Sequence, residues 1–477
     1  MDLGHALSLA APEAFVALAT LALLIVGAVM RPNAALVWLL SAIALVIAAA
    51  LAVVAPQGTA FAGGFVADAG AVYAKVAIYL MSAVALALGA GWLSRLKARQ
   101  FEYPILILLS ALGMGVMASS GDLISLYVGV ELQSLAAYVL AAFRRDDAKA
   151  SEAALKYFVL GALSSGLLLY GASLIYGFAG SVKFADIAAA AHAGAANGIL
   201  FGLVFLICGL AFKVSAAPFH MWIPDVYEGA PTAVVAFFAA APKLAAMVLF
   251  ARALADAFPG AADQWRQVLI VIAVISMLLG AFAGLVQRNL KRLWAYSSIA
   301  NIGYALVGLS AGTAEGVQSM LVFMVLYMID VTGFFACLMA LARDGRPMET
   351  MDDMAGLMRE RPGMALAMTA FAVSAIGFPP FSGFWAKIFV FKAIIDAGYG
   401  WVAVVGLVSS VVAAFYYLRL VKVIWFDPPP SGVVDAPPPD AQGVAYAAAL
   451  FSFPAVLVAL AGLYPAARAA AAAFGFG

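Results

Sequence analysis

The sequence predicts an all-α membrane protein of about fourteen transmembrane helices, with two inverted five-helix repeats that each contain a proline-broken helix. Three observations lead to this fold class. Hydrophobic residues make up 66% of the 477 residues and charged residues 11%, and the mean hydropathy is +1.04. Apolar runs of about 20 residues, the length that crosses a bilayer, recur along the chain. Two of these runs are broken by proline. Such a composition excludes a water-soluble globular protein.

The charge and the cysteines exclude several classes of function. A net charge of +1 provides no basic surface for nucleic acid. The two cysteines, Cys208 and Cys337, lie in apolar runs, and the sequence contains no CxxC, no HExxH and no histidine pair at metal-ligand spacing. We therefore expect no redox centre and no metal on this chain. Residues 1–30 lack a basic n-region and a small-residue cleavage site, so we expect them to form a retained first span.

The apolar runs place fourteen spans in a single polytopic membrane domain, residues 1–477, with boundaries good to a few residues. In order, the expected spans are 10–30, 34–55, 71–93, 103–120, 122–143, 151–177, 198–221, 231–256, 265–286, 291–311, 315–341, 362–395, 400–424 and 443–466. We assign three additional helices to 1–100, a first repeat of helices 4–8 to 103–256, a second repeat of helices 9–13 to 265–424, and a proline-rich tether with helix 14 to 425–477.

Basic residues are concentrated in the loops that follow odd-numbered spans, or at the span ends beside them. These residues are Arg31, Arg95, Lys97, Arg99, Arg144, Arg145, Lys149, Arg288, Lys291, Arg292, Arg343, Arg346, Arg359, Arg361, Arg419 and Lys422. The opposite side carries only Lys183, Arg252, Arg266 and Arg468. Because the cytoplasmic loops of membrane proteins carry an excess of Lys and Arg, we expect the first set in the cytoplasm and both termini outside.

The two proline-broken runs are KVSAAPFHMWIPDVYEGAP at 213–231 and GFPPFSGFWAK at 377–387. Pro218 removes a helix hydrogen bond and frees carbonyls that only neighbouring helices, polar side chains or trapped water can satisfy. Five spans separate the two breaks, and this odd number makes the broken helices run in opposite directions. Inverted repeats with paired broken helices near the middle of the membrane are a recurrent transporter design.

Ionisable residues lie inside several spans. They are Glu131 in span five, Lys156 about one turn inside span six, Lys213 in span seven, Lys243 in span eight, Asp330 in span eleven and Lys387 in span twelve. Lys243 is about 18–20 Å from either end of its helix, too far for its side chain to reach the membrane surface. A charge at this depth costs about 2.5–3.5 kcal/mol. Burial disfavours the charged form of a lysine, so a buried lysine can exchange its proton. The series predicts a proton relay.

Structural roles stay open for single members of this series. Glu131 with one lysine could only fix helix packing, and the stretch around Lys213 could be a kink whose lysine reaches the interface. His220, two residues after Pro218, could be a relay group or could bind a freed carbonyl. For Asp330, hydrogen bonding between helices and transport are equally supported by the sequence.

Five segments carry a family resemblance. They are SLYVGVELQSLAAYVL, LKYFVLGALSSGLLLYG, the broken run at 213–231, NLKRLWAYSSIANIGY and GFPPFSGFWAK. Through them the chain, from about Pro104 to Lys422, resembles the antiporter-like proton-pumping subunits of respiratory complex I. In this family the position of Lys387 is lysine in subunits N and L and typically glutamate in subunit M. Lys387, and the lack of residues after Gly477 for the long lateral helix of subunit L, favour subunit N.

The resemblance implies roles for the buried residues. Glu131 and Lys213 would form the coupling pair, Lys243 would be the central relay and Lys387 the exit-side lysine. Lys156 would be an accessory group near the pair.

The resemblance also implies a setting. The chain would be a proton-translocating membrane subunit of a multisubunit NADH:quinone oxidoreductase in a bacterial inner membrane, with both termini periplasmic. NADH, flavin, iron–sulfur clusters and quinone would be held by partner subunits. The expected partners are the other membrane subunits, including neighbouring antiporter-like subunits, through them the peripheral redox arm, and membrane lipids. The chain departs from the family pattern at Asn301, where many relatives have histidine. An asparagine can order water but cannot carry a proton at neutral pH.

Two other functions remain open from the sequence. A stand-alone or Mrp-type sodium/proton antiporter would share the fold and the lysines, and co-purification with a large NADH-oxidising assembly would argue against it. A purely structural membrane scaffold would tolerate a neutral residue at Lys213 or Lys243.

Overall fold

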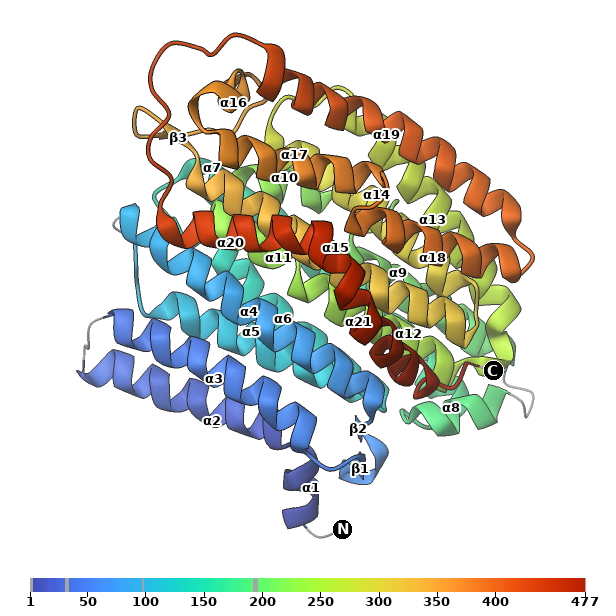
Figure 1. Cartoon of the computed structure of the whole chain (residues 1–477). Helices are drawn as coiled ribbons and strands as arrows, with labels where there is room; N and C mark the ends of the chain where they lie inside the picture. Colours follow the sequence, from blue (N-terminus) through green and yellow to red (C-terminus); the bar gives the residue numbers. More distant parts are fainter. Residues whose placement is uncertain (1–2, 31–33, 97, 192–195, 477) are drawn as a thin grey trace.

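The computed structural model describes residues 3–30, 34–96, 98–191 and 196–476, and within these ranges it is a helical bundle with two short hairpins (Figure 1). The long helices run side by side along one common direction. Arg31 and Lys97, two of the basic residues used to predict topology, lie outside the described ranges.

The spanning helices follow the expected order. Before the first repeat lie α2 (Ala11–Ile25, continued by the π-helical η1, Val26–Met30), α3 (Ala34–Val54) and α4 (Ala69–Arg95). The region 103–256 holds α5 (Glu102–Ala118), α6 (Leu123–Ala141), α7 (Ala148–Ala179), α9 (Ala196–Val214), α10 (Trp222–Gly229), α11 (Thr232–Ala239) and α12 (Ala241–Ala257). The region 265–424 holds α13 (Ala262–Gly284), α14 (Leu290–Ser310), α15 (Ala314–Ala340), α17 (Pro362–Ile376), α18 (Ser382–Asp396) and α19 (Gly400–Phe426). The last span is α20 (Pro439–Leu450), η6 (Phe451–Ala455) and α21 (Val456–Ala472).

The predicted helix count is confirmed. Eleven helical segments of the described residues are long and apolar enough to cross a membrane. The shorter α5, the more polar α14 and the broken pair α17–α18 complete the fourteen spans.

Polar side chains fix where several of these helices begin. Asp68, Asp122, Asp147, Asn289 and Thr313 each stand at the position before a helix and accept a hydrogen bond from a backbone N–H of its first turn. Such N-caps satisfy donors that the helix itself cannot use. The apolar runs therefore become helices with ends that the sequence marks.

Both predicted breaks are present. The seventh span ends as α9 at Val214 and resumes as α10 at Trp222. The twelfth span ends as α17 at Ile376, where Gly377 takes the left-handed conformation that commonly ends a helix (φ +89°), and resumes as α18.

The structure also breaks span eight, which the sequence predicts as one continuous helix over 231–256. α11 stops at Ala239, and α12 starts at Ala241 with Pro242 in its first turn. Proline has no N–H to donate to the preceding turn, so it accepts a position at the start of a helix and not in its interior. Pro242 was the available signal for this break.

The two ends of the bundle differ in what they carry (Figure 1). Both termini, the β1–β2 hairpin (Gly58–Ala60 and Phe65–Ala67) and α8 (Phe184–Ala190) lie toward one end. The β3–β4 hairpin (Ala342–Arg343 and Arg346–Pro347) and α16 (Leu357–Glu360) lie at the other end. An even number of spans requires both termini at one end, as observed.

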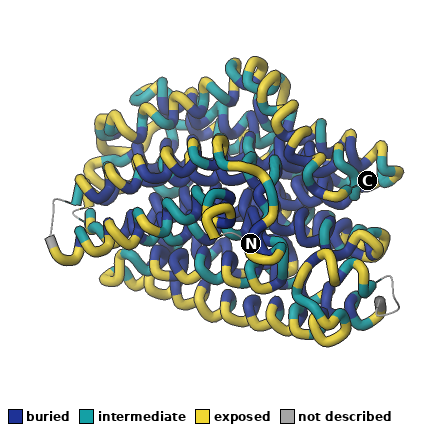
Figure 2. Tube along the Cα trace, turned by 90° about the horizontal axis from the view of Figure 1, so that it is seen from below, coloured by how far each residue is buried: buried dark blue, intermediate teal, exposed yellow. Residues whose placement is uncertain are grey.

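Burial is greatest in the middle of the bundle and least at its rim, where exposed residues follow the outer helices (Figure 2). In the apolar stretch of α11–α12, 94% of residues are buried, and in α15 83%, against 22% in α20–α21. The outward side chains of the helices are themselves apolar, such as Leu18 and Val411, as expected for a surface that faces lipid. The helices that carry Lys243 and Asp330 therefore form the centre of the molecule.

Glycines allow the site helices to approach each other closely. A Cβ atom at Gly113 of α5 would lie 2.4 Å from the Gln133 backbone nitrogen of α6, and one at Gly171 of α7 would lie 2.7 Å from the Gly202 carbonyl oxygen of α9. Contact of small residues is a common way to pack helices in membranes, where lipid provides no hydrophobic driving force between them. These crossings hold α6 against α5 and α7 against α9.

Candidate functional site

Glu131 and Lys213 lie where α6, α7 and α9 meet. Glu131, Ser134 and Tyr138 share one face of α6 at spacings of three and seven residues. Lys213 Nζ donates to Ser134 Oγ at 2.8 Å and to the Tyr138 hydroxyl at 3.5 Å, and Ser165 of α7 donates to Glu131. Within the described ranges no ion pair joins Glu131 to Lys213 directly. A proton moving between them would pass through hydroxyls or water.

The break between α9 and α10 is braced by side chains. The Ala217 backbone N–H donates to Ser276 Oγ of α13 at 2.8 Å, and Trp222 Nε1 donates to the Phe212 carbonyl at 3.1 Å. These bonds satisfy backbone groups that the break leaves free. His220 is half-buried in this turn, and among the residues that the structure describes its Nδ1 has no hydrogen-bond partner. The structure places His220 at the break, as expected, and its role stays a prediction.

Lys156 forms ion pairs with carboxylates other than Glu131. Its ammonium group is exposed and contacts Glu152 at 2.8 Å and Asp225 at 2.9 Å, and Asp225 also pairs with Arg292 at 2.7 Å. Lys156 is nine residues from Ser165 on the same helix, or about 13–14 Å along its axis. Lys156 is thus held by a partly exposed ion-pair network, and its role as an accessory group stays a prediction.

Lys243 is the most deeply buried of the predicted lysines, with 1% of its surface exposed. It is the third residue of α12, directly after the break at Ala240. It donates to Ser298 of α14, which also accepts a hydrogen bond from the Tyr327 hydroxyl of α15 at 2.7 Å. Its Nζ lies 5.6 Å from the centre of the Tyr227 ring. In the part of the chain that is described, no carboxylate lies within ion-pair distance of it.

Lys387 sits at the break of the twelfth span. Its Nζ donates to the Ala375 carbonyl at 2.8 Å, to the Ile376 carbonyl at 3.0 Å and to Ser410 Oγ at 2.8 Å. It also lies 4.7 Å from the centre of the Tyr304 ring. The two carbonyls are the last of α17, which have no partner inside their own helix, and a cation is favourable at this end of a helix dipole.

Asp330 of α15 lies at the same break. Its Oδ2 accepts hydrogen bonds from Ser374 at 2.6 Å and from Ser382 at 2.7 Å, and Ser382 is within 2.8 Å of Ser452 in η6. Its Oδ1 is buried and has no hydrogen-bond partner among the described residues. The carboxylate thus joins three elements while one oxygen stays free.

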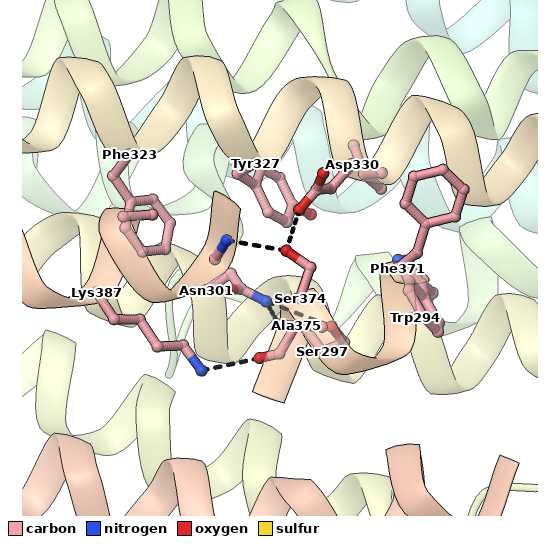
Figure 3. Close-up of a pocket in the computed structure, with 13 residues that line it drawn as sticks. Trp294, Ser297, Asn301, Phe323, Tyr327, Asp330, Phe371, Ser374, Ala375 and Lys387 are labelled. Carbon is pink, nitrogen blue, oxygen red and sulfur yellow. Dashed lines mark hydrogen bonds between the residues drawn. The ribbon is translucent and has the colours of Figure 1, made fainter. Parts of the chain in front are cut away.

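A cavity of about 30 Å³ lies between these groups (Figure 3). Asp330, Lys387, Asn301, Ser297 and Tyr327 are among the residues that line it. One water needs about 10–15 Å³, so the cavity has room for about two. Asn301 donates to the Ser297 carbonyl at 2.9 Å and can orient water there.

The hydroxyl groups that hold the ionisable residues were not predicted from the sequence. They are Ser134, Ser165, Ser298, Tyr327 and Ser410. Serine and tyrosine are common in membrane helices, so their presence alone carries little signal. Only the spacing of Ser134, three residues after Glu131 on one helix face, was available from the sequence. Within the described ranges no group of three or more His, Cys, Asp or Glu side chains is arranged to hold a metal ion.

The fold and the lysines inside the bundle define an antiporter-like membrane subunit. Residues 120–413 match the family model described as NADH:quinone oxidoreductase/Mrp antiporter, TM. The chain is 71% identical over 391 residues to NADH-quinone oxidoreductase subunit N of Caulobacter sp. (strain K31), covering 80% of this chain and 81% of that protein. It is 52% identical over 427 residues to the subunit N of Rhodospirillum rubrum, covering 88% and 87%. The chain belongs to the family of NADH-quinone oxidoreductase subunit N.

Solved structures agree with this assignment. A chain of respiratory complex I from Thermus thermophilus with bound aureothin superposes with a TM-score of 0.82 at 32% identity, covering 96% of this chain and 99% of that one. A chain of the Mrp complex from Dietzia sp. DQ12-45-1b superposes with a TM-score of 0.86 at 24% identity, covering 100% and 98%. At 24% identity, the similarity to the Mrp chain shows a shared fold alone.

Proposed function

We propose that this chain is the proton-translocating membrane subunit of an NADH:quinone oxidoreductase, and that Glu131, Lys213, Lys243 and Lys387 carry its protons. The observation that supports this most is the row of lysines at the centre of the bundle, each held by hydroxyls or carbonyls and not by a permanent carboxylate partner. A lysine held by neutral oxygens can give up its proton without leaving an unpaired buried carboxylate.

The proposed mechanism starts at Glu131. When its carboxylate stands close to Lys213, the negative charge stabilises the ammonium form of that lysine. When a neighbouring subunit draws Glu131 away, Lys213 releases its proton through Ser134 and water toward Lys243. Lys387 then receives it and passes it to the outer side.

The energies are compatible with such a switch. Moving one proton against roughly 150–200 mV takes about 3.5–4.6 kcal/mol, at about 2.3 kcal/mol per 100 mV. At an effective dielectric constant of about 20, a carboxylate that approaches an ammonium group to about 4 Å stabilises it by about 4 kcal/mol. Withdrawal of a single carboxylate is therefore sufficient, in magnitude, to expel one proton from a buried lysine.

On this proposal, partner subunits hold NADH, flavin, the iron–sulfur clusters and quinone, and this chain supplies only a proton path. It assembles with the other membrane subunits of the complex, including neighbouring antiporter-like ones. It lies in the bacterial inner membrane, with its basic loops in the cytoplasm and both termini in the periplasm.

The test uses the assembled complex in inverted membrane vesicles. Lys243→Ala should reduce NADH-driven proton uptake by at least about tenfold, because positioned proton-transfer groups contribute about 10²–10⁴-fold and water can replace only part of this. Lys243→Arg should be equally impaired, since arginine keeps the charge but does not release its proton. The matched control is Lys392→Ala, which removes an exposed lysine of α18 paired with Asp396.

Three outcomes distinguish the proton relay from a structural scaffold and from a sodium/proton antiporter. Full uptake in Lys243→Ala, with assembly verified on native gels, contradicts a relay role. Normal uptake in Lys243→Arg but not in Lys243→Ala indicates a structural cation, as a scaffold would need. Sodium-driven proton exchange by the chain in the absence of NADH indicates an antiporter.

A further inference from the structure

Asp330 is a buried carboxylate to which the relay described above gives no role. Two serine hydroxyls bind its Oδ2, while its Oδ1 is buried without a hydrogen-bond partner among the described residues. A buried polar atom left unsatisfied costs about 1–3 kcal/mol, and more when it is charged. A purely structural carboxylate would gain from pairing both oxygens, so the free oxygen is the first sign of another role.

The cavity at the break of span twelve places this carboxylate opposite Lys387 (Figure 3). Asp330 and Lys387 lie on either side of the last residues of α17. Ser374 donates to Asp330 at 2.6 Å, and Lys387 donates to the carbonyl of the next residue, Ala375, at 2.8 Å. Room for about two waters lies between the groups that line this space. Asp330 and Lys387 therefore line one cavity that can hold water.

On the other side of Asp330, hydrogen bonds connect the cavity with Lys243. Tyr327 precedes Asp330 by three residues on α15, so the two side chains share a face of that helix, and both line the cavity. The Tyr327 hydroxyl donates to Ser298 Oγ, which also accepts from Lys243. Asp330 thus lies between the central lysine and the exit-side lysine.

Few other ionisable groups face this carboxylate. Of the side chains that line the cavity in the described part of the chain, Lys387 on α18 and Tyr327 on α15 are titratable. Neutral polar groups come from the other elements packed around it. They are Ser297 and Asn301 on α14, Ser374 on α17, Ser382 on α18 and Ser452 in η6.

We propose that Asp330 carries the proton between Lys243 and Lys387, an inference that rests on the proposed proton-translocating function. In the first step the Lys243 ammonium becomes a neutral amine, and its proton passes through water and hydroxyls to the Asp330 carboxylate, which becomes a neutral carboxyl group. In the second step the carboxyl group gives this proton to the neutral amine of Lys387, which becomes an ammonium. The carboxylate is then regenerated, and one proton has moved.

The alternative is that Asp330 only ties α15 to α17 and α18. Asparagine distinguishes the two, because its carbonyl oxygen can still accept the hydrogen bonds from Ser374 and Ser382 but cannot take up a proton. If the role is structural, Asp330→Asn should keep the normal ratio of protons moved per NADH oxidised, and the longer Asp330→Glu should lower this ratio. A proton-carrying role predicts the reverse order.

The experiment measures protons moved per NADH oxidised in inverted vesicles with verified assembly. Asp330→Asn is expected to lower this ratio at least about tenfold, as for loss of a positioned proton-transfer group, and Asp330→Glu to restore part of it. Asp263→Asn, at an exposed aspartate at the start of α13, is the matched control. Lys243→Ala is measured beside them as the reference for the relay itself.

Infrared difference spectroscopy during turnover detects the protonation of a carboxyl group, which a change in side-chain packing alone does not produce. The wild-type complex should show the carbonyl band of a carboxyl group that becomes protonated, the band should vanish in Asp330→Asn, and it should shift in Asp330→Glu. If Asp330→Asn fails to assemble, the shifted band in Asp330→Glu still decides the question.

A normal proton ratio in Asp330→Asn beside an impaired Lys243→Ala overturns this inference and leaves the proposed function standing. Normal ratios in both variants overturn the proposed function as well. An unshifted band in Asp330→Glu also overturns the assignment to Asp330.

Discussion

Lys213, Lys243 and Lys387 differ in what holds their ammonium groups. Lys213 contacts two hydroxyls on the helix that also carries Glu131, so a nearby charge can act on it. Lys243 has one serine hydroxyl and an aromatic ring. Lys387 has two backbone carbonyls at a helix end, which offer a favourable place for a cation. On the proposed mechanism, the three lysines would serve the successive steps of loading, transfer and release.

Glu131 gives the residue-scale prediction. Glu131→Gln should abolish most coupled proton uptake, because the amide can still accept the hydrogen bond from Ser165 but lacks the charge that acts on Lys213. Glu131→Asp, which is shorter by one methylene, should retain part of the activity. The measurement is NADH-driven quinone reduction and proton uptake in the same membranes, with Glu102→Gln at the exposed start of α5 as the matched control. Equal losses in Glu131→Asp and Glu131→Gln would argue against a switching carboxylate.

At the scale of elements, the ionisable residues are grouped around helix breaks and close helix crossings. The breaks after α9, after α11 and after α17 each lie within a few residues of a predicted relay lysine. A broken helix exposes backbone groups that bind water or polar side chains, which an unbroken helix in lipid cannot offer. The crossings of α5 with α6 and of α7 with α9 then fix the helices that carry Glu131 and Lys213.

The α7–α9 crossing gives the element-scale prediction. Gly171→Ala should reduce the amount and the thermal stability of the assembled complex, because the added Cβ would lie 2.7 Å from the Gly202 carbonyl oxygen. We expect a cost of about 1–3 kcal/mol, the usual range for overpacking. Gly177→Ala on the same helix is the control, since nothing lies within 4 Å of a Cβ there. Assembly is followed on native gels during a temperature series, and equal melting of the two variants would show that the crossing is not tight.

At the scale of the whole molecule, the basic residues of the loops and the ionisable residues inside the bundle lie in different places. The end of the bundle that carries β3, β4 and α16 holds most of the arginines and lysines of the loops, while Lys243 and Lys387 of the proposed relay are buried between helices. The path also crosses between the two predicted repeats, because Lys243 of the first contacts Ser298 of the second. A relay built across this boundary would respond to small shifts of one repeat against the other.

The orientation in the membrane gives the whole-molecule prediction. A reporter enzyme that is active only outside the cytoplasm should be active when fused after residue 477 and inactive when inserted after Arg145, in the exposed loop between α6 and α7. The reason is the excess of basic residues on the side of that loop. Activity in the opposite pattern would invert the topology and with it the direction of the proposed path.

The sequence by itself determined the fourteen spans, the breaks at Pro218 and around Pro379, and the positions of the ionisable residues within the spans. These properties depend on the length of each apolar run, on the missing N–H of proline and on the position of a residue within its run. Each of these can be read from a short stretch of sequence.

Only the tertiary structure decided which groups meet. Lys213 contacts a serine 79 residues away and Lys243 one 55 residues away, Glu131 and Lys213 are not in direct contact, and Lys156 pairs with Asp225 at a partly exposed site. Such contacts depend on how each helix is rotated about its own axis. In a membrane protein the lipid-facing and the buried faces of a helix are both apolar, so the pattern of apolar residues does not reveal that rotation.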